Sequence, residues 1–171
     1  MAHPIMPHSI DVHTHAFHPK IAEKAIAQLG AHYRVQMPYN GLIDDLLLKM
    51  DQAGLERALV HCAATKAEQV IPANNWAIHL QESQPRLLSF GTLHPEFHDF
   101  EGELDRLASA GIRGIKLHPD FQGYWLNDPA LRPIFECIGD RFIMMIHVGD
   151  DYPPEKNPTC PFKLAKILED F

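Results

Sequence analysis

The chain has 171 residues, 46% hydrophobic and 22% charged, which is the composition of an ordinary soluble globular protein with a sizeable core. Its formal charge of −7 argues against nucleic acid or an anionic membrane as a partner. No stretch has the roughly 18 apolar residues of a membrane span, and the start lacks the basic and apolar regions of a signal peptide. We therefore expect a single domain, residues 1–171, in the cytoplasm.

Five short apolar segments are predicted to be strands, and helical stretches lie between them. The strands are expected at residues 10–17, 57–64, 87–93, 114–118 and 142–148, and from the second onward they recur about every 30 residues, the length of a βα unit. The helices are expected at residues 19–29, 44–53, 74–83, 100–110, 128–138 and 161–170, with Gly30, Gly54 and Gly111 as stop signals. This alternation predicts an α/β fold with a parallel sheet.

Cysteine and histidine indicate different chemistry. Cys62, Cys137 and Cys160 are odd in number and form no C-x-x-C pair, which argues against a disulfide framework or a thiolate zinc site. Histidine occurs 12 times, and imidazole is the commonest metal ligand in proteins. The positions of the histidines are therefore the main functional signal.

The first predicted strand carries His13 and His15 in Asp11-Val12-His13-Thr14-His15. Alternate residues of a strand point to the same side, so these two imidazoles can hold one metal ion between them. Two polar rings at the end of an apolar strand would be costly without partners. A metal-dependent enzyme is the first hypothesis.

Other histidines end the later strands, and in parallel α/β folds such strand ends meet at the functional face. His147 is a candidate ligand, with a buried structural histidine as the alternative. His118 is a candidate ligand, a group supporting a ligand, or a substrate contact. The roles of His61 and His94 stay open between structural and supporting. Five of the six remaining histidines are expected to be solvated, namely His3, His8, His32, His79 and His98.

Lys116 shares the strand face of His118, because one residue separates the two. A lysine facing a barrel interior is costly unless it pairs with an anion or is modified. It is expected to bind a substrate carboxylate, to bridge two metals as a carbamate, or to reach solvent at the mouth of the strand.

Three segments together resemble the amidohydrolase superfamily, in particular amidohydrolase family 2. They are the His-x-His segment, residues 111–119 around Lys116 and His118, and residues 145–149 around His147. The resemblance implies a TIM-type (β/α)8 barrel with a divalent metal, usually zinc with manganese as an alternative, held by His13, His15 and His147. It implies hydrolysis of an amide, lactone or ester carbonyl of a small molecule by a metal-activated water. The leading hypothesis adds His118 and Lys116 at the substrate. Some members of the family are decarboxylases.

The sequence departs from this family in its extent. An eight-stranded barrel takes about 250 residues, whereas the helix that follows the fifth strand closes at residue 170. The strand-six histidine and strand-eight aspartate of the family have no counterpart, although Asp150 and Asp151 follow the fifth strand and are candidates to approach the metal. We expect an incomplete barrel of five parallel strands, without the last three βα units. Its open edges favour association, for example as a homo-oligomer.

Two further functions compete with the hydrolase. A catalytically incompetent fragment that only binds a metal or a partner chain fits the absent strands. Phosphoesterases that begin with His-x-His fit the first strand, but they need an acidic bridging ligand where this chain has Lys116 and His118.

Overall fold

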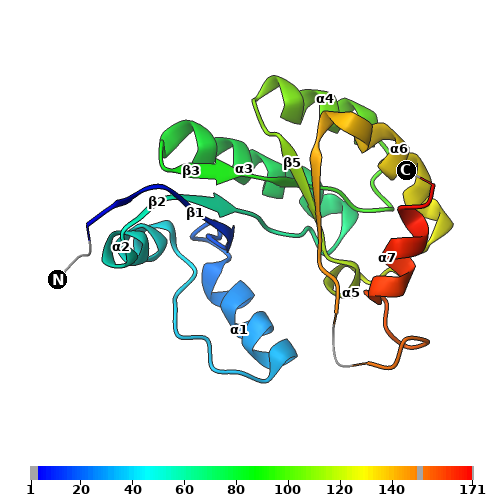
Figure 1. The fold of residues 1–171 in the computed structure, drawn as a ribbon, viewed down its shortest axis with the longest axis horizontal. Helices are drawn as coiled ribbons and strands as arrows, with labels where there is room; N and C mark the ends of the chain where they lie inside the picture. Colours follow the sequence, from blue (N-terminus) through cyan, green and yellow to red (C-terminus); the bar gives the residue numbers. More distant parts are fainter. Residues whose placement is uncertain (1–3, 150–151, 171) are drawn as a thin grey trace. The chain divides into compact units, whose positions relative to one another are not determined.

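The structure is a computed structural model that describes residues 4–149 and 152–170 (Figure 1). The chain divides into two compact units, the first made of Met1–Cys62 and His79–Ser89, the second of Ala63–Ile78 and Phe90–Phe171. Each unit holds a three-stranded sheet, and every pairing in both sheets is parallel. The predicted parallel α/β class is confirmed, whereas the single domain over residues 1–171 stays a prediction.

The sheet of the first unit has the order β1 (Met6–Thr14), β2 (Leu55–Val60) and β3 (Leu87–Ser89). Two helices, α1 (Ala22–Tyr33) and α2 (Ile43–Ala53), connect β1 to β2. As predicted, α2 ends before a glycine: Gly54 adopts a left-handed φ of 69°, and β2 starts at the next residue. The predicted stop of the first helix at Gly30 is wrong.

Helix α1 continues through Gly30 to Tyr33, and Arg34 takes the left-handed position after it, at φ 55°. The Arg34 backbone N–H bonds to the carbonyl of Gly30. A glycine costs only about 1 kcal/mol inside a helix, so flanking residues with good helix propensity carry the helix past it.

The sheet of the second unit has the order β4 (Gly91–Thr92), β5 (Gly114–Leu117) and β6 (Ile143–Ile146). Its helices are α4 (Phe100–Ser109), α5 (Pro119–Gln122), α6 (Arg132–Ile138) and α7 (Pro161–Ile167), and α3 (Val70–Ser83) begins in this unit and ends in the first. Short 3-10 turns lie at Ala67–Gln69, Pro129–Leu131 and Gly139–Arg141.

The third predicted strand differs from the structure, because residues 87–93 are divided at Phe90 into β3 and β4. The Phe90 ring lies against the backbone of Gly114, where an added Cβ would come within 2.3 Å of it. Only glycine leaves room for the ring at this position. The pattern of residues 87–93 does not show that β3 pairs with β2 whereas β4 pairs with β5.

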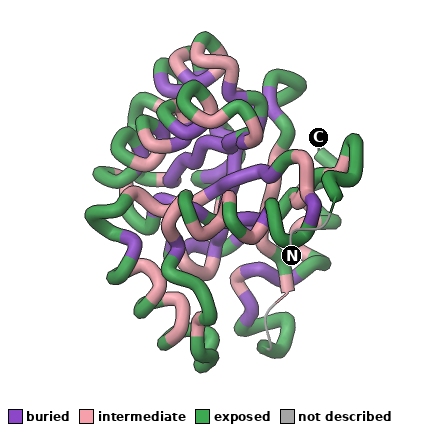
Figure 2. The backbone as a smooth tube through the Cα atoms, turned by 90° about the vertical axis from the view of Figure 1, so that its left-hand side faces the viewer, coloured by how far each residue is buried: buried purple, intermediate pink, exposed green. Residues whose placement is uncertain are grey.

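A large hydrophobic core cluster belongs to the second unit. Figure 2 colours all buried residues of the chain purple. Ile115 and Leu117 point into this cluster and are fully buried, together with Leu104 and Leu107 of α4. Because strand side chains alternate, Lys116 lies on the opposite face of β5. One face of β5 is thus committed to packing, whereas the opposite face carries the polar Lys116.

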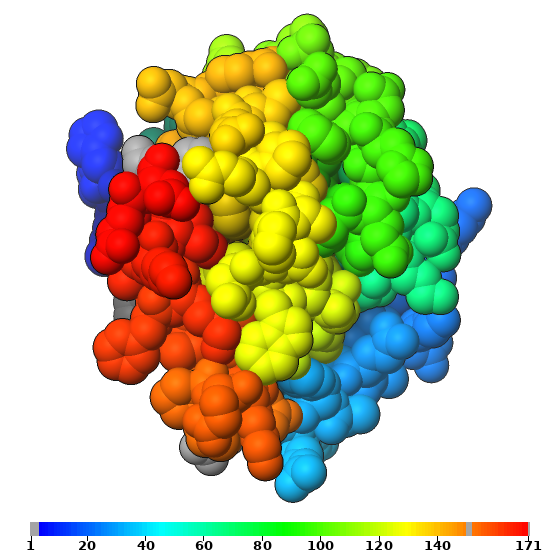
Figure 3. Space-filling model, turned by 90° about the vertical axis from the view of Figure 1, so that its right-hand side faces the viewer, coloured from blue at the N-terminus to red at the C-terminus, as the bar shows by residue number. Residues whose placement is uncertain are grey.

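Strand β6 ends this sheet and pairs with β5 alone among the described residues. An apolar groove of about 420 Å³ lies beside it, under α7, which is red next to the yellow α6 in Figure 3. Its lining is Phe135, Met144, Met145, Ile146, Leu164, Ile167 and Leu168. In the first unit, β1 is also an end strand and exposes Ile10 and Val12.

Three of the expectations concern residues outside the described part, namely His3, Asp150 and Asp151. The other four histidines that were expected to be solvated are exposed. No helix in the described ranges is long and apolar enough to cross a membrane.

Candidate functional site

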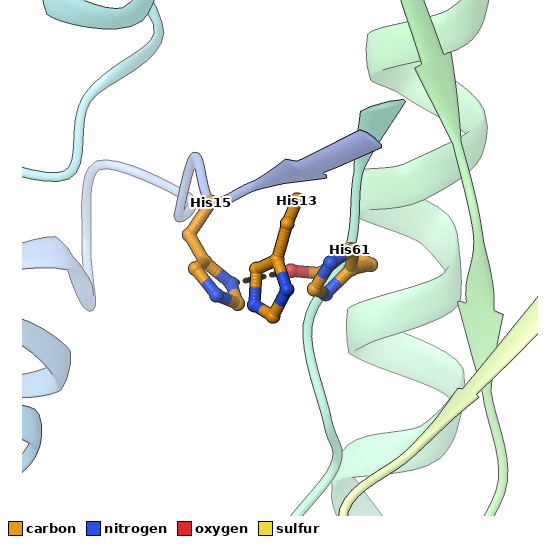
Figure 4. A group of neighbouring side chains, drawn as sticks. All are labelled: His13, His15 and His61. Carbon is orange, nitrogen blue, oxygen red and sulfur yellow. Dashed lines mark hydrogen bonds between the residues drawn. The ribbon is translucent and has the colours of Figure 1, made fainter. Parts of the chain in front are cut away.

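Three histidines converge at the carboxyl ends of β1 and β2 in the first unit (Figure 4). His13 and His15 come from β1 and the residue after it, and His61 directly follows β2. The ring centroids lie 5.3 Å apart for His13 and His15, and 4.7 Å apart for each of them and His61. One ring nitrogen from each residue lies within 4.8 Å of the others.

Strand register explains why His61 joins the pair. Thr14 pairs with Val60, so the next residues along the two parallel strands, His15 and His61, are neighbours. The His61 N–H donates to the carbonyl of Thr14 at 3.1 Å, and the His61 carbonyl lies 2.8 Å from Nδ1 of His15. The two strand ends are therefore linked in both directions.

This contact defines the chemistry of His15. A carbonyl only accepts hydrogen bonds, so Nδ1 of His15 carries the proton and Nε2 keeps its lone pair. A ring fixed in this way by a carbonyl is the usual state of a metal-bound histidine, because the contact sets both tautomer and orientation. His15 is built to present Nε2 to a cation.

His13 is oriented by the first residue of its own motif. Its backbone N–H donates to the Asp11 carboxylate at 2.9 Å, in a stretch where the β1–β2 register is irregular. A β-bulge there leaves a backbone donor without its ladder partner, and the carboxylate satisfies it. Asp11 therefore supports the shape of the strand end rather than adding a ring contact.

His61 is the site residue that sequence reasoning underrated. Only 1% of His61 is exposed, and both ring nitrogens are buried, whereas His13 and His15 are exposed. Its position as the last polar residue of an apolar strand was the available signal. The register that brings it beside His15 is not visible in the sequence.

The other predicted site residues lie in the second unit, after β4, β5 and β6. His118 and His147 stack face to face, with ring centroids 3.9 Å apart and 9° between the planes. Nδ1 of His118 accepts the backbone N–H of Phe121 at 3.4 Å. The predicted ligand set of His13, His15 and His147 draws on both units and stays a prediction.

Lys116 lies on the same side of the second sheet, and only 3% of it is exposed. No hydrogen bond or ion pair to its ammonium comes from the described residues. Burial lowers the pKa of Lys116, because the charged form loses its hydration. A side chain that reaches solvent at the strand mouth does not fit this burial, whereas an anion brought by a ligand would pair with the buried amine.

His94, after β4, has both ring nitrogens near backbone atoms. Nδ1 accepts the N–H of Glu96 at 3.2 Å, and Nε2 lies 3.2 Å from the carbonyl of Gln122. This leaves no lone pair for a metal ion, which assigns His94 a supporting position.

Comparisons with known proteins identify the family of the chain. The model of a family described as amidohydrolase matches residues 10–171. The chain belongs to this amidohydrolase family. The resemblance to amidohydrolase family 2 is thus confirmed, and the family is one of enzymes. No curated protein sequence matches the chain.

Two solved structures have a similar fold. A probable 2-pyrone-4,6-dicarboxylic acid hydrolase from Acinetobacter baumannii with citric acid bound is 18% identical, with a TM-score of 0.57 over 95% of this chain and 53% of its own. A 2,6-dihydroxybenzoate decarboxylase in complex with 2,6-dihydroxybenzoate is 17% identical, with a TM-score of 0.61 over 88% of this chain and 53% of its own. The amidohydrolase chain spans about half the length of each, in line with the predicted incomplete TIM-type barrel.

Proposed function

We propose that this amidohydrolase chain carries the metal-binding half of a metal-dependent hydrolase acting on a small molecule with a carboxylate. The observation that supports the proposal is the convergence of three imidazoles from β1 and β2 in a chain of this family. Three neutral nitrogen ligands suit Zn²⁺ best, with Mn²⁺ as the alternative ion.

The donor set fits a divalent ion. His15 offers Nε2 because its Nδ1 is held by the His61 carbonyl, and His13 lies beside it with its backbone fixed by Asp11. A metal bound there supplies a water of lowered pKa and polarises a carbonyl of the substrate.

The second unit supplies the substrate contacts in this proposal. Lys116 pairs with a carboxylate of the substrate. The buried ammonium has lost its hydration, and the negative charge of the carboxylate replaces the stabilisation that water gave it. His118 acts as a hydrogen-bond donor: the Phe121 N–H occupies the Nδ1 lone pair, so the proton of the neutral ring resides on Nε2.

The third protein ligand is the point to be decided. The family resemblance implies His147, whereas the geometry of the first unit offers His61. We propose a site centred on His13 and His15, with His61 and His147 as the alternative third ligands.

Metal content measured on the purified chain tests the proposal. After chelation and reconstitution with Zn²⁺, we expect about one ion per chain. His13→Ala should abolish this binding, and His98→Ala, an exposed histidine, is the matched control that should leave it unchanged. Comparing His61→Ala with His147→Ala identifies the third ligand. Retention of full zinc content by His13→Ala would reject the metal site.

Reaction type needs a second measurement, because fold likeness below 20% identity does not distinguish a hydrolase from a decarboxylase. We would assay the zinc-loaded protein on lactones, amides and esters that bear a carboxylate, and on aromatic acids for CO₂ release. Hydrolysis that disappears in Lys116→Met supports the proposal. Zinc binding without turnover of any substrate assigns the chain a binding role, and CO₂ release assigns the decarboxylase.

A further inference from the structure

A single amide side chain, Gln122 at the end of α5, connects the histidine-bearing segments of the second unit. Its two N–H groups donate to the carbonyls of Ala64, at 2.8 Å, and Leu93, at 2.7 Å. Its Oε1 accepts the N–H of His118 at 2.7 Å and the O–H of Tyr124 at 2.9 Å. Gln122 is 4% exposed, and all four hydrogen-bonding positions of its amide are used.

The main chain of Gln122 adds two further bonds. Its N–H donates to the carbonyl of His118 at 2.9 Å, and its carbonyl lies 3.2 Å from Nε2 of His94. The Glu96 N–H occupies the other nitrogen of His94, so the proton of the neutral ring resides on Nε2 and points at Gln122. One residue thus sets the tautomer of one histidine and the backbone position of another.

Tyr124 contributes to the fixed polarity of this network. Burial raises the pKa of Tyr124, because a phenolate would lose its hydration there, and its O–H remains a donor to Oε1. With Oε1 held as the acceptor, the amide cannot be reversed without placing its N–H groups against two donors and its oxygen against two carbonyls. Gln122 therefore has one orientation.

We infer that Gln122 is a positioning residue: its side chain fixes the main chain at Leu93 and His118, next to or at the histidines that end β4 and β5, and so holds its own carbonyl against the ring of His94. The ring of His118 in turn stacks on His147, so a shift of the His118 main chain would also reach the histidine that follows β6. The link to catalysis rests on the proposed function, in which His118 contacts the substrate. The link to the position of the main chain does not, since it follows from the contacts alone.

A purely structural amide in the same unit provides a matched control. Asn74 is also buried: its Nδ2 donates to the carbonyl of Thr92 and to Glu103, and its Oδ1 accepts the Thr92 N–H. It contacts no histidine through these bonds. Loss of Asn74 should destabilise the unit without changing the state of any ring in the network.

The experiment compares Gln122→Met with Asn74→Leu in the 171-residue chain, by recording histidine ring ¹⁵N spectra. In the parent and in Asn74→Leu, we expect His94 as the Nε2–H tautomer. Gln122→Met keeps the main-chain carbonyl that faces Nε2 of His94 but loses the four side-chain bonds that hold this carbonyl in place, so we expect averaged His94 nitrogen shifts and altered His118 signals. Binding of citrate, used as a carboxylate probe, should weaken by about tenfold or more in Gln122→Met alone.

Gln122→Glu is the second variant, in case Gln122→Met does not fold. It keeps the acceptor for the His118 N–H and the Tyr124 O–H but loses the donors to Ala64 and Leu93, so the main-chain carbonyl of residue 122 should again lose its fixed place against the His94 ring. Unchanged His94 and His118 spectra in a folded Gln122 variant overturn the inference, as does an equal change in Asn74→Leu. Altered spectra together with absent zinc binding in the parent would support the positioning role while rejecting the proposed function.

Discussion

The two units of the chain both place histidines at the ends of parallel strands, but the rings are arranged differently. In the first unit, His13, His15 and His61 meet edge to face with their nitrogens directed toward one another. In the second unit, His118 and His147 stack face to face, and both nitrogens of His94 contact the backbone. Similar sequence positions thus give a metal-type cluster in one unit and a hydrogen-bonding network in the other.

The difference lies in what the strand ends do with their main-chain groups. The carbonyl of His61, directly after β2, fixes the Nδ1 proton of His15 and leaves its outer nitrogen for a cation. An N–H after β4 instead occupies the lone pair of His94. The direction of one backbone group decides whether an imidazole can be a ligand.

The largest predicted effect concerns the unequal cores of the two units. Leu104→Ala removes a fully buried side chain from the large core of the second unit and should cost about 2–5 kcal/mol of unfolding free energy. Leu48→Ala, at an exposed position of α2, is the control and should change little. Urea unfolding followed by circular dichroism measures both. If Leu104→Ala lowers the unfolding free energy by less than about 1 kcal/mol, the core of the second unit does not contribute the larger share of stability expected here.

The second prediction tests whether the metal stabilises the first unit selectively. Zn²⁺ at a hundred times its Kd should stabilise the metal-bound state by about 2.7 kcal/mol, which corresponds to about 100-fold slower exchange of amides that open only on release of the ion. We expect this slowing in β1 and β2, by hydrogen exchange with mass spectrometry, and none in His13→Ala. Added protection in β6 would identify His147 as a ligand, and protection absent from β1 would contradict the site.

The third prediction concerns Lys116, whose pKa is lowered by burial. Between this lowered value and the value of about 10.4 in the unfolded chain, the unfolded state binds more protons, so stability rises with pH. The charged Lys116 therefore lowers the unfolding free energy by its full amount below the folded-state pKa, and this loss decreases as the pH rises above that value. Lys116→Met should stabilise the protein by roughly 1–2 kcal/mol at pH 7 and by less at pH 10.

Thermal unfolding at the two pH values measures this effect. Arg113→Met, at an exposed position just before β5, is the control and should show no such dependence on pH. If Lys116→Met is instead destabilised at pH 7, the ammonium already has a stabilising partner in the protein. The argument that a substrate carboxylate pairs with Lys116 would then fail.

The sequence was sufficient for the elements that depend on local pattern. Alternating apolar and amphipathic segments predicted the parallel strands, and the glycine after α2 predicted its end. The break at Phe90 was missed because local pattern does not show that β3 pairs with β2 whereas β4 pairs with β5. The extra turn of α1 was missed because a glycine stop signal is weak within a favourable helix.

The candidate site was predictable to the same degree. The His-x-His spacing indicated a paired site because it needs only the alternation of one strand. His61 required the register between β1 and β2, which single-sequence patterns do not contain. Gln122 gave no signal at all, since an amide after a short turn is usually solvated and only its distant partners reveal its role.

The Gln122 network has a consequence for how this protein can change over generations. Two of the groups that it satisfies are main-chain carbonyls, at Ala64 and Leu93, and no side-chain substitution at those positions can remove them. A compensating mutation for the loss of Gln122 is therefore not available at its partners. Among related sequences, we expect residue 122 to change less often than the buried apolar residues around it. At those positions, a larger side chain at one site can compensate for a smaller one at a neighbouring site.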